Sequence, residues 1–332
     1  MLRTFNRNSA RAAATWIAAA LITVPIAASG QAQGGAPAQF ITLGTMGGPV
    51  PDSSRSQPAN VIIAGRDAYL VDIGDGTAGQ LAKAGIALPR VRAVFISHLH
   101  FDHTGGLGAL LGLRYQTNAP GKLTIYGPPG TKELVAGLAA SMVPGATAGY
   151  GLPGAPYVDP ANTLEVIELR GDDDLMLGRI RVRTVANTHY SFPDDSDLGR
   201  RFRSLSIRFD MPDRSILYTG DTGPSRAVES LAKGADLLVA EMIDVDRTMA
   251  KVRANTPNVS ADAASGLMQH LSKHHLTPLD VGRLAAAAQV KSLVVTHLAA
   301  PGATGTDELK YLRDIAANFS GPAVIAHDLD AF

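Results

Sequence analysis

Apolar residues occur along this chain of 332 residues mainly in short runs of three to eight, separated by glycine, proline or charged residues. Short apolar runs with such boundaries are typical of buried β-strands. The pattern predicts strands at residues 40–43, 60–64, 68–73, 91–96, 123–126, 164–169, 179–186, 204–209, 215–219, 237–240, 293–296 and 323–325.

A second set of segments carries apolar residues three and four positions apart, which is typical of amphipathic helices. These segments predict helices at residues 79–84, 131–140, 224–233, 260–272 and 278–288. The strands follow one another both in hairpin-like order and in strand–helix–strand order. We therefore expect mixed sheets covered by helices, which is an α/β (α+β) fold class.

The N-terminus has the layout of a secretory signal peptide. Three arginines within the first eleven residues are followed by an apolar stretch at 12–28 and by small residues at 29–32. An uncleaved membrane anchor is the alternative, but Pro25 interrupts the stretch, which falls short of the roughly 20 apolar residues that span a bilayer. We expect a signal peptide at 1–32, a periplasmic or secreted protein, and no stable membrane insertion after cleavage.

Residues 33–39 form a linker rich in glycine, proline and glutamine, and 40–332 form one domain large enough for a substantial core. The full chain has 30 basic and 30 acidic residues, and the signal peptide holds three of the basic ones and no acid. The remainder therefore has 27 against 30, a net charge of −3, with no basic bias toward nucleic acid. Cysteine is absent, so neither a disulfide nor a thiolate ligand is available.

Residues 98–103 read HLHFDH and place three histidines and one aspartate within six positions, one residue after an apolar run. Imidazole and carboxylate groups are the ligands of zinc and of similar divalent metals. A turn with this spacing can direct two sets of ligands at two neighbouring metal ions. The motif therefore predicts a metal site at the end of a buried strand.

Three further ligand-type residues, His189, Asp221 and His297, each follow an apolar run. Open β-sheet folds gather their sites at the carboxyl ends of strands, so these residues are expected to meet the HLHFDH turn. We predict two Zn²⁺ ions, with Mn or Fe possible on the same ligands. Two cations lower the pKa of a shared water from about 15.7 toward 7, which indicates hydrolysis. One ion would be held by His98, His100 and His189, the other by Asp102, His103 and His297, and Asp221 would bridge them.

Several other motifs accompany this turn: GTMGGPVPDSSR from Gly44, YLVDIGDGT from Tyr69, IYGPPG from Ile125, NTHYS around His189, SLSIRFDMPDRSILYTGDTGPS from Ser204, LLVAE ending at Glu241, and HHLTP and VTHL near the end. With them the chain resembles the metallo-β-lactamase fold superfamily, in the branch of ribonuclease Z and arylsulfatase-like hydrolases. The resemblance implies a four-layer αβ/βα sandwich of two mixed sheets flanked by helices. It also implies a dinuclear zinc site at one edge of the sheets with the same seven ligands.

The resemblance further implies a catalytic pair in which a strand-end glutamate supports a histidine that protonates the leaving group. Glu241 and His275 fit these roles, with Asp102 as the third catalytic residue and His274 as a competitor of His275. A carboxylate on one ring nitrogen fixes the tautomer and lets the other nitrogen act as an acid. From spacing alone, a surface contact between helix and strand would be the simpler interpretation. Asp72 is equally compatible with a turn and with a hydrogen bond to a metal-binding histidine.

The substrate prediction depends on the neutral segment 142–162, which is rich in glycine, proline and alanine and is expected to be irregular, as a lid or as a plain loop. A basic arm for a polyanion is absent from it, and an exported protein does not meet precursor transfer RNA. We therefore expect a small-molecule ester substrate, either an aryl or alkyl sulfate or a phosphodiester, and no nucleic-acid partner. The alternatives are a lactonase or β-lactamase and a non-catalytic zinc-binding protein. A homodimer is compatible with the sequence.

Overall fold

The computed structural model describes residues 37–332 apart from residues 153, 155 and 194. The predicted signal peptide and most of the linker at 33–39 lie outside the described residues, so export and these boundaries stay predictions. Within the described part, no helix is both long and apolar enough to cross a membrane.

The first sheet has six strands in the order β1-β2-β3-β4-β5-β6. Its first three strands are antiparallel, and β3 to β6 run parallel to one another. The strands are β1 Gln39–Gly44, β2 Ala59–Ala64, β3 Asp67–Ile73, β4 Val91–Phe95, β5 Leu123–Gly127 and β6 Leu164–Glu168.

The second sheet has seven strands in the order β13-β12-β11-β10-β9-β8-β7. Strands β10 to β13 are parallel, whereas β7 to β10 pair in antiparallel fashion. The strands are β7 Asp174–Leu177, β8 Ile180–Ala186, β9 Leu205–Asp210, β10 Ser215–Tyr218, β11 Leu237–Ile243, β12 Ser292–Ala299 and β13 Ala323–Ile325.

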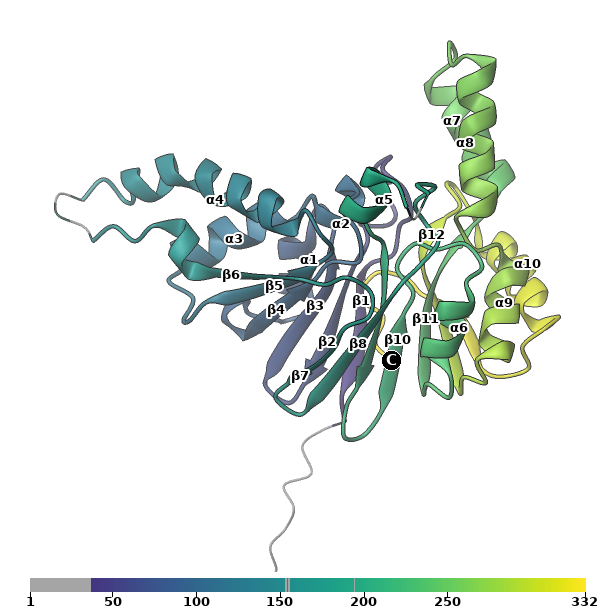
Figure 1. Cartoon of the computed structure of the whole chain (residues 1–332), viewed down its shortest axis with the longest axis horizontal. Helices are drawn as coiled ribbons and strands as arrows, with labels where there is room; N and C mark the ends of the chain where they lie inside the picture. The colour runs from purple at the N-terminus through teal and green to yellow at the C-terminus, as the bar shows by residue number, and fades with distance from the viewer. Residues whose placement is uncertain (1–36, 153, 155, 194) are drawn as a thin grey trace, which may run out of the picture. The chain divides into compact units, whose positions relative to one another are not determined.

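Helices cover the outer face of each sheet, which gives four layers (Figure 1). The first sheet packs against α1 Thr77–Lys83, α3 Leu107–Gln116 and α4 Thr131–Ala148. The second packs against α6 Arg226–Ala232, α9 Pro278–Ala287 and α10 Gly305–Ala316. The mixed sheets and the four-layer arrangement confirm the predicted fold class.

The two sheets bury a shared core of aromatic and aliphatic side chains between them. Phe40 and Phe95 come from the first sheet and Phe209 and Tyr218 from the second, and all four are at most 1% exposed. Phe95 stacks on Tyr126 at 4.7 Å between ring centroids and meets Phe209 edge-on at 5.1 Å. These contacts pack the inner faces of the two sheets against each other.

A helical hairpin of α7 Val245–Asn255 and α8 Ala261–Lys273 projects beyond the ends of β11 and β12 (Figure 1). The remaining helices are the short α2 Phe101–Thr104 and α5 Asp197–Arg201 and the 3₁₀ turns Leu88–Arg90 and Pro160–Thr163. Met249 and Leu271 attach the hairpin to Ile243 and Ala299 of the second sheet.

The structure departs from the predicted elements in two ways. The sequence pattern does not indicate α2, α3, α5, α7, α10 or β7. The segment 142–162, expected to be irregular, is helical as far as Ala148, because α4 continues through Pro144. Proline lacks only one backbone donor, and the buried Val135 and Ala139 hold the earlier turns of α4 on the sheet.

Candidate metal centre

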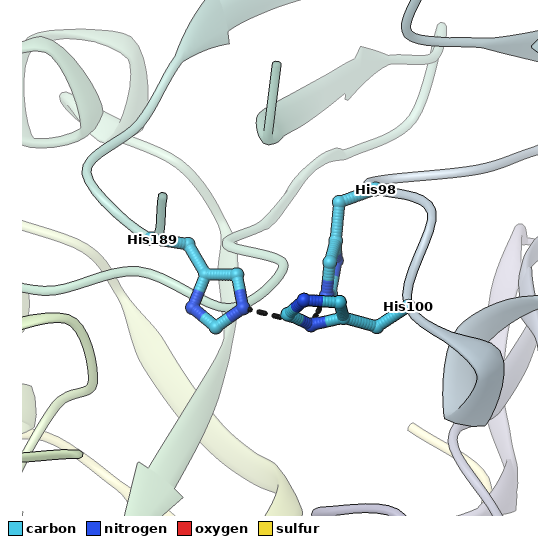
Figure 2. Close-up of side chains that lie close together, drawn as sticks. All are labelled: His98, His100 and His189. Atoms are coloured by element: carbon cyan, nitrogen blue, oxygen red, sulfur yellow. Dashed lines mark hydrogen bonds between the residues drawn. The ribbon is translucent and has the colours of Figure 1, made fainter. Parts of the chain in front are cut away.

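The HLHFDH turn connects β4 to α2 and lies at the edge where the strand ends of both sheets meet. Figure 2 shows the first predicted ligand set, His98, His100 and His189, with their ring nitrogens converging on one point. His100 Nδ1 lies 3.0 Å from His98 Nε2 and 3.1 Å from His189 Nε2. His98 and His189 are buried, whereas His100 is exposed toward solvent. The structure thus brings together residues that are 91 positions apart.

The second predicted set, Asp102, His103 and His297, lies beside the first. Asp102 Oδ2 is 3.6 Å from His103 Nε2 and 3.6 Å from His297 Nε2. Asp221, which follows β10, reaches both sets. Its Oδ1 is 3.4 Å from His103 Nε2, and its Oδ2 is 3.2 Å from His297 Nε2 and 4.0 Å from His98 Nε2. All seven predicted ligands therefore lie within one cluster.

Several ligand atoms in this cluster lack hydrogen-bond partners among the described residues. They are His103 Nε2, His297 Nε2 and Asp221 Oδ1, all of them buried. Buried polar atoms without partners destabilise a fold, and the observed atoms are the ones that a divalent cation would bind. The donor set of imidazoles and carboxylates fits zinc and similar metals. The residues therefore fit a metal pair.

Asp72 orients His103 from behind. Its Oδ2 lies 2.7 Å from His103 Nδ1. The same oxygen accepts hydrogen bonds from Ser97 Oγ at 2.8 Å and from the Tyr218 hydroxyl at 2.7 Å. The other oxygen, Oδ1, accepts a hydrogen bond from the Ser97 amide. A carboxylate in this position places the proton on Nδ1 and leaves Nε2 free for a metal. Burial lowers the pKa of His103, but the carboxylates of Asp221, Asp102 and Asp72 together raise it well above its usual value. Of the two interpretations left open for Asp72, the structure thus favours the hydrogen bond.

A β-bulge positions His297 and Glu241. The pairing of β11 with β12 shifts register between Ala240 and Met242, and His297 has a positive φ of 42°. A bulge inserts an extra residue into one strand and turns its side chain out of the regular alternation. The bulge therefore directs His297 toward the ligand cluster from within a strand that continues to Ala299.

Glu241 and His275 form a buried pair next to the ligands. His275 Nδ1 lies 3.0 Å and 3.1 Å from the two carboxylate oxygens of Glu241. Burial lowers the pKa of His275, but the Glu241 carboxylate outweighs it and raises this pKa to about 9. The competing residue, His274, instead contacts the backbone carbonyl of Thr188. The structure therefore places His275 against Glu241.

A cavity of about 420 Å³ lies directly over the ligands. Phe101, between two predicted ligands, and His270, on α8, both line it, and the sequence pattern predicts neither of them as a site residue. His270 is half-buried, with its ring centroid 5.2 Å from that of His189 and 5.5 Å from that of His275. Among the described residues of 142–162, none lines this cavity, whereas the α7–α8 hairpin and the loop after β1 both do.

The four-layer sandwich with a cluster of histidines and aspartates at one edge defines the class of metallo-β-lactamase fold hydrolases. The β-lactamase superfamily domain matches residues 68–298, and the chain belongs to this family. A ribonuclease Z of Mycobacterium sp. (strain KMS) is 30% identical over 269 residues, which cover 80% of this chain and 86% of the relative. A ribonuclease Z of Mycobacterium bovis (strain BCG / Pasteur 1173P2) is 27% identical over 292 residues, covering 87% and 96%.

Solved structures share the fold over most of the chain. The metallo-β-lactamase fold protein YhfI of Bacillus subtilis has a TM-score of 0.62 at 19% identity, covering 90% of this chain and all of its own. The short form of human tRNase Z has a TM-score of 0.59 at 20% identity, covering 89% of this chain and 98% of its own. At sequence identities this low, the similarity shows that the fold is shared and carries no further conclusion.

These relatives correct the substrate prediction. The expectation of a hydrolase for small ester-type substrates, aryl or alkyl sulfates among them, with no nucleic-acid partner, is wrong, because relatives over 80% of the chain are ribonucleases. The missing basic arm was weak evidence, since a pair of bound cations itself supplies positive charge where a phosphate must lie. The periplasmic or secreted location stays a prediction from residues 1–32.

Proposed function

We propose that this chain is a metal-dependent ribonuclease that hydrolyses a phosphodiester bond of RNA with two bound zinc ions. The observation that carries the proposal is the double ligand cluster joined by Asp221 beside the Glu241–His275 pair. It occurs in a chain that is 30% identical to a ribonuclease Z over 80% of its length. Zinc is favoured by the number of imidazole ligands, and manganese or iron would accept the same residues.

The ligand roles follow from the two sets. His98, His100 and His189 would hold one ion, Asp102, His103 and His297 the other, and Asp221 would contact both. Two divalent cations held there would supply Lewis acidity toward the attacking water and the phosphate.

The carboxylates of Asp102 and Glu241 serve different tasks. Burial raises the pKa of Asp102, but His103 and His297 outweigh it and lower this pKa to about 2. The Asp102 carboxylate can therefore accept a hydrogen bond from the attacking water and orient it toward phosphorus. Glu241 holds the Nδ1 side of His275, which leaves Nε2 to face the site.

Hydrolysis adds one water across the phosphodiester. The water oxygen bonds to phosphorus, the bond from phosphorus to the leaving nucleoside oxygen breaks, and that oxygen receives a proton from His275 Nε2. The proton of the water restores the acid after product release. Because the His275 imidazolium is stabilised by Glu241, the acid is protonated at neutral pH.

A direct test uses the purified zinc-loaded protein and an end-labelled RNA hairpin with a single-stranded 3′ extension. We expect specific cleavage that stops after metal chelation and returns when zinc is added back. His275→Ala, with both metals retained, should be severely impaired. Intact RNA after incubation with protein that carries two metals per chain would overturn the proposal.

A further inference from the structure

The cavity over the metal ligands is lined by two chemically different groups of residues. One group consists of residues of the ligand cluster and His275, where the scissile phosphate would lie. The other group, the apolar end, consists of apolar side chains from outside the four-layer core. A volume of about 420 Å³ falls in the range of roughly 300–1,000 Å³ that holds a small molecule. The cavity therefore accepts one compact part of a substrate next to the phosphate.

The apolar end is built mainly by the α7–α8 hairpin. Val252 of α7 and Leu267 and Leu271 of α8 line it, together with Val50 and Pro51 from the loop after β1. The wall is attached to the fold, because Leu271 is 9% exposed and packs with Met249, Ile243 and Ala299. A wall of this composition favours a flat, weakly hydrated group over a charged one.

Phe101 supplies an aromatic surface at the mouth of the same cavity. It is 86% exposed, although the two residues beside it in sequence, His100 and Asp102, belong to the ligand cluster. Among the described residues it stacks on no other aromatic side chain, whereas Tyr190 and Phe192 nearby are in ring contact with each other. Stacking of a planar group on an exposed ring of this kind is favourable, because the stacking removes apolar surface from water.

Positive charge is scarce at the apolar end. Of the two cationic side chains that line the cavity, Arg55 donates to Glu308 at 2.7 Å and to Thr45 at 2.7 Å, so its charge is already paired. Lys251 is exposed and shares the rim with Asp52. Contacts to further phosphates of an RNA backbone are therefore poorly supported here. Stacking and apolar contact are the interactions that this end can offer.

We propose that the cavity is a nucleoside subsite, in which the base next to the scissile phosphodiester stacks on Phe101 and packs against the wall formed by Val252, Leu267 and Leu271. The inference rests on the proposed function, which places the phosphodiester at the ligand cluster. The new element is the identity of the substrate group that the cavity binds, which is the nucleoside beside the phosphodiester. Because every base has an aromatic face, the subsite recognises a single-stranded nucleotide with little preference for its identity.

The test compares two chromogenic phosphodiesters with the same leaving group, adenosine 5′-p-nitrophenyl phosphate and methyl p-nitrophenyl phosphate. The zinc-loaded full chain should have the higher kcat/KM for the nucleoside probe. Phe101→Ala should reduce the ratio of the two kcat/KM values by roughly 5- to 150-fold, which corresponds to the loss of one stacked base. Phe101 lies between two ligands, so its substitution can change the metal occupancy. Such a change affects both probes equally and leaves the ratio of their kcat/KM values unaltered.

Two control variants separate stacking from disturbance of the turn. Phe101→Trp keeps an aromatic face and should retain the preference for the nucleoside probe. Tyr157→Ala removes another exposed aromatic ring, one that does not line this cavity, and should leave the ratio unchanged. Calorimetric titration with AMP gives a second readout that needs no turnover, and Phe101→Ala should weaken AMP binding by a similar factor.

The possible failures are distinguishable. If the wild type hydrolyses both probes equally well, or if Phe101→Ala keeps the preference, the subsite is wrong while the proposed hydrolysis stands. If the wild type hydrolyses neither probe, the AMP titration decides whether the subsite exists. AMP affinity that is weakened in Phe101→Ala supports it, and unchanged or undetectable binding overturns it.

Discussion

Asp221 is the residue on which the two ligand sets depend, because its two oxygens face histidines of both sets. It is 3% exposed, and although burial raises its pKa, the surrounding histidines lower it well below its usual value. The carboxylate therefore stays ionised inside the protein. A single charged group in this position can hold two cations at a fixed separation.

Replacing Asp221 by Asn keeps the shape of the side chain and removes the charge and one of the two acceptor oxygens. We expect the purified variant to retain at most one metal per chain and to lose at least about 100-fold in RNA hydrolysis. Mutation of a residue that only orients a metal ligand already reduces metal affinity or activity by 10- to 100-fold. Metal content after dialysis is the measurement. Asp174→Asn, exposed on β7, should keep two metals. Two tightly held metals in Asp221→Asn would contradict the bridging role.

Removing the acid should affect turnover and spare the metals. His275→Ala should lower kcat for RNA by roughly 10²- to 10⁴-fold, the usual contribution of a general acid, with metal content unchanged. A kcat that stays within a few-fold of the wild type would show that the leaving group does not depend on His275.

The pH dependence gives an independent test of the same pair. The protonated form of His275 is present below its pKa and is lost as the pH rises through it, so activity should fall on the alkaline side. The Glu241 carboxylate raises this pKa, and Glu241→Gln should therefore move the alkaline fall to lower pH. An unchanged profile would exclude His275 as the group that titrates.

The sequence leaves the role of Asp72 open, because aspartate is also an ordinary turn residue. In the structure its carboxylate meets His103, Ser97 and Tyr218, and Tyr218 lies 146 positions away. Asp72→Asn should weaken metal binding by about 10- to 100-fold, measured by competition with a chelating dye. Wild-type affinity in this variant would mean that His103 is oriented by other contacts.

At the scale of elements, the site depends on a short pairing between the chain after β1 and the end of β12. The Gly47 amide donates to the Leu298 carbonyl at 3.1 Å, beside the bulge that directs His297. A Cβ added at Gly47 would lie 2.5 Å from the Ala299 amide nitrogen and 2.8 Å from His297 Nδ1. Both distances are too short for any side chain.

Gly47→Ala should therefore displace His297 and reduce metal occupancy, measured on folded protein by metal analysis and circular dichroism. The matched control is Gly112→Ala in α3, where an added Cβ meets no atom within 4 Å. This control should keep both metals and gain about 0.5–1 kcal/mol in free energy of unfolding, because glycine is unfavourable within a helix. Full occupancy in Gly47→Ala would contradict the role of this pairing.

The pattern of apolar runs located twelve of the strands because most of them bury at least one face, and burial is what the pattern records. It ended β12 early, at residue 296, because His297 interrupts the apolar run although the strand continues to Ala299. The hairpin helix α7 was missed because most of its face is polar and only Met249 is fully buried. Surfaces such as the wall beside Phe101 arise from tertiary packing, and local periodicity carries no signal for them.

At the scale of the whole molecule, the ligand cluster concentrates buried polar atoms that lack partners within the described residues. Metal binding should therefore stabilise the fold in addition to supporting catalysis. A ligand at a thousand times its dissociation constant adds about 4 kcal/mol to the free energy of unfolding. Zinc added to the metal-free protein should raise Tm by several degrees in a calorimetric scan. Equal Tm values would indicate that the unpartnered atoms are satisfied without metal.

The seven ligands could be grouped from the sequence because residues that end apolar runs meet at one edge of a sheet. The substrate could not be predicted in the same way. Charge composition and the interpretation of residues 1–32 favoured small esters, whereas the relatives across 80% of the chain are ribonucleases. One metal pair serves several kinds of ester, so the reacting bond is set by what the surroundings of the metals can bind.

Hydrolysis of RNA phosphodiesters is the activity that we propose for this metal site. The most direct measurement is kcat/KM of one zinc-loaded preparation for an RNA with a single-stranded 3′ extension and for an aryl sulfate of similar leaving group. A ribonuclease site predicts efficient RNA cleavage that is lost in both Asp221→Asn and His275→Ala, together with far slower sulfate hydrolysis. Rapid hydrolysis of the sulfate with intact RNA would contradict it.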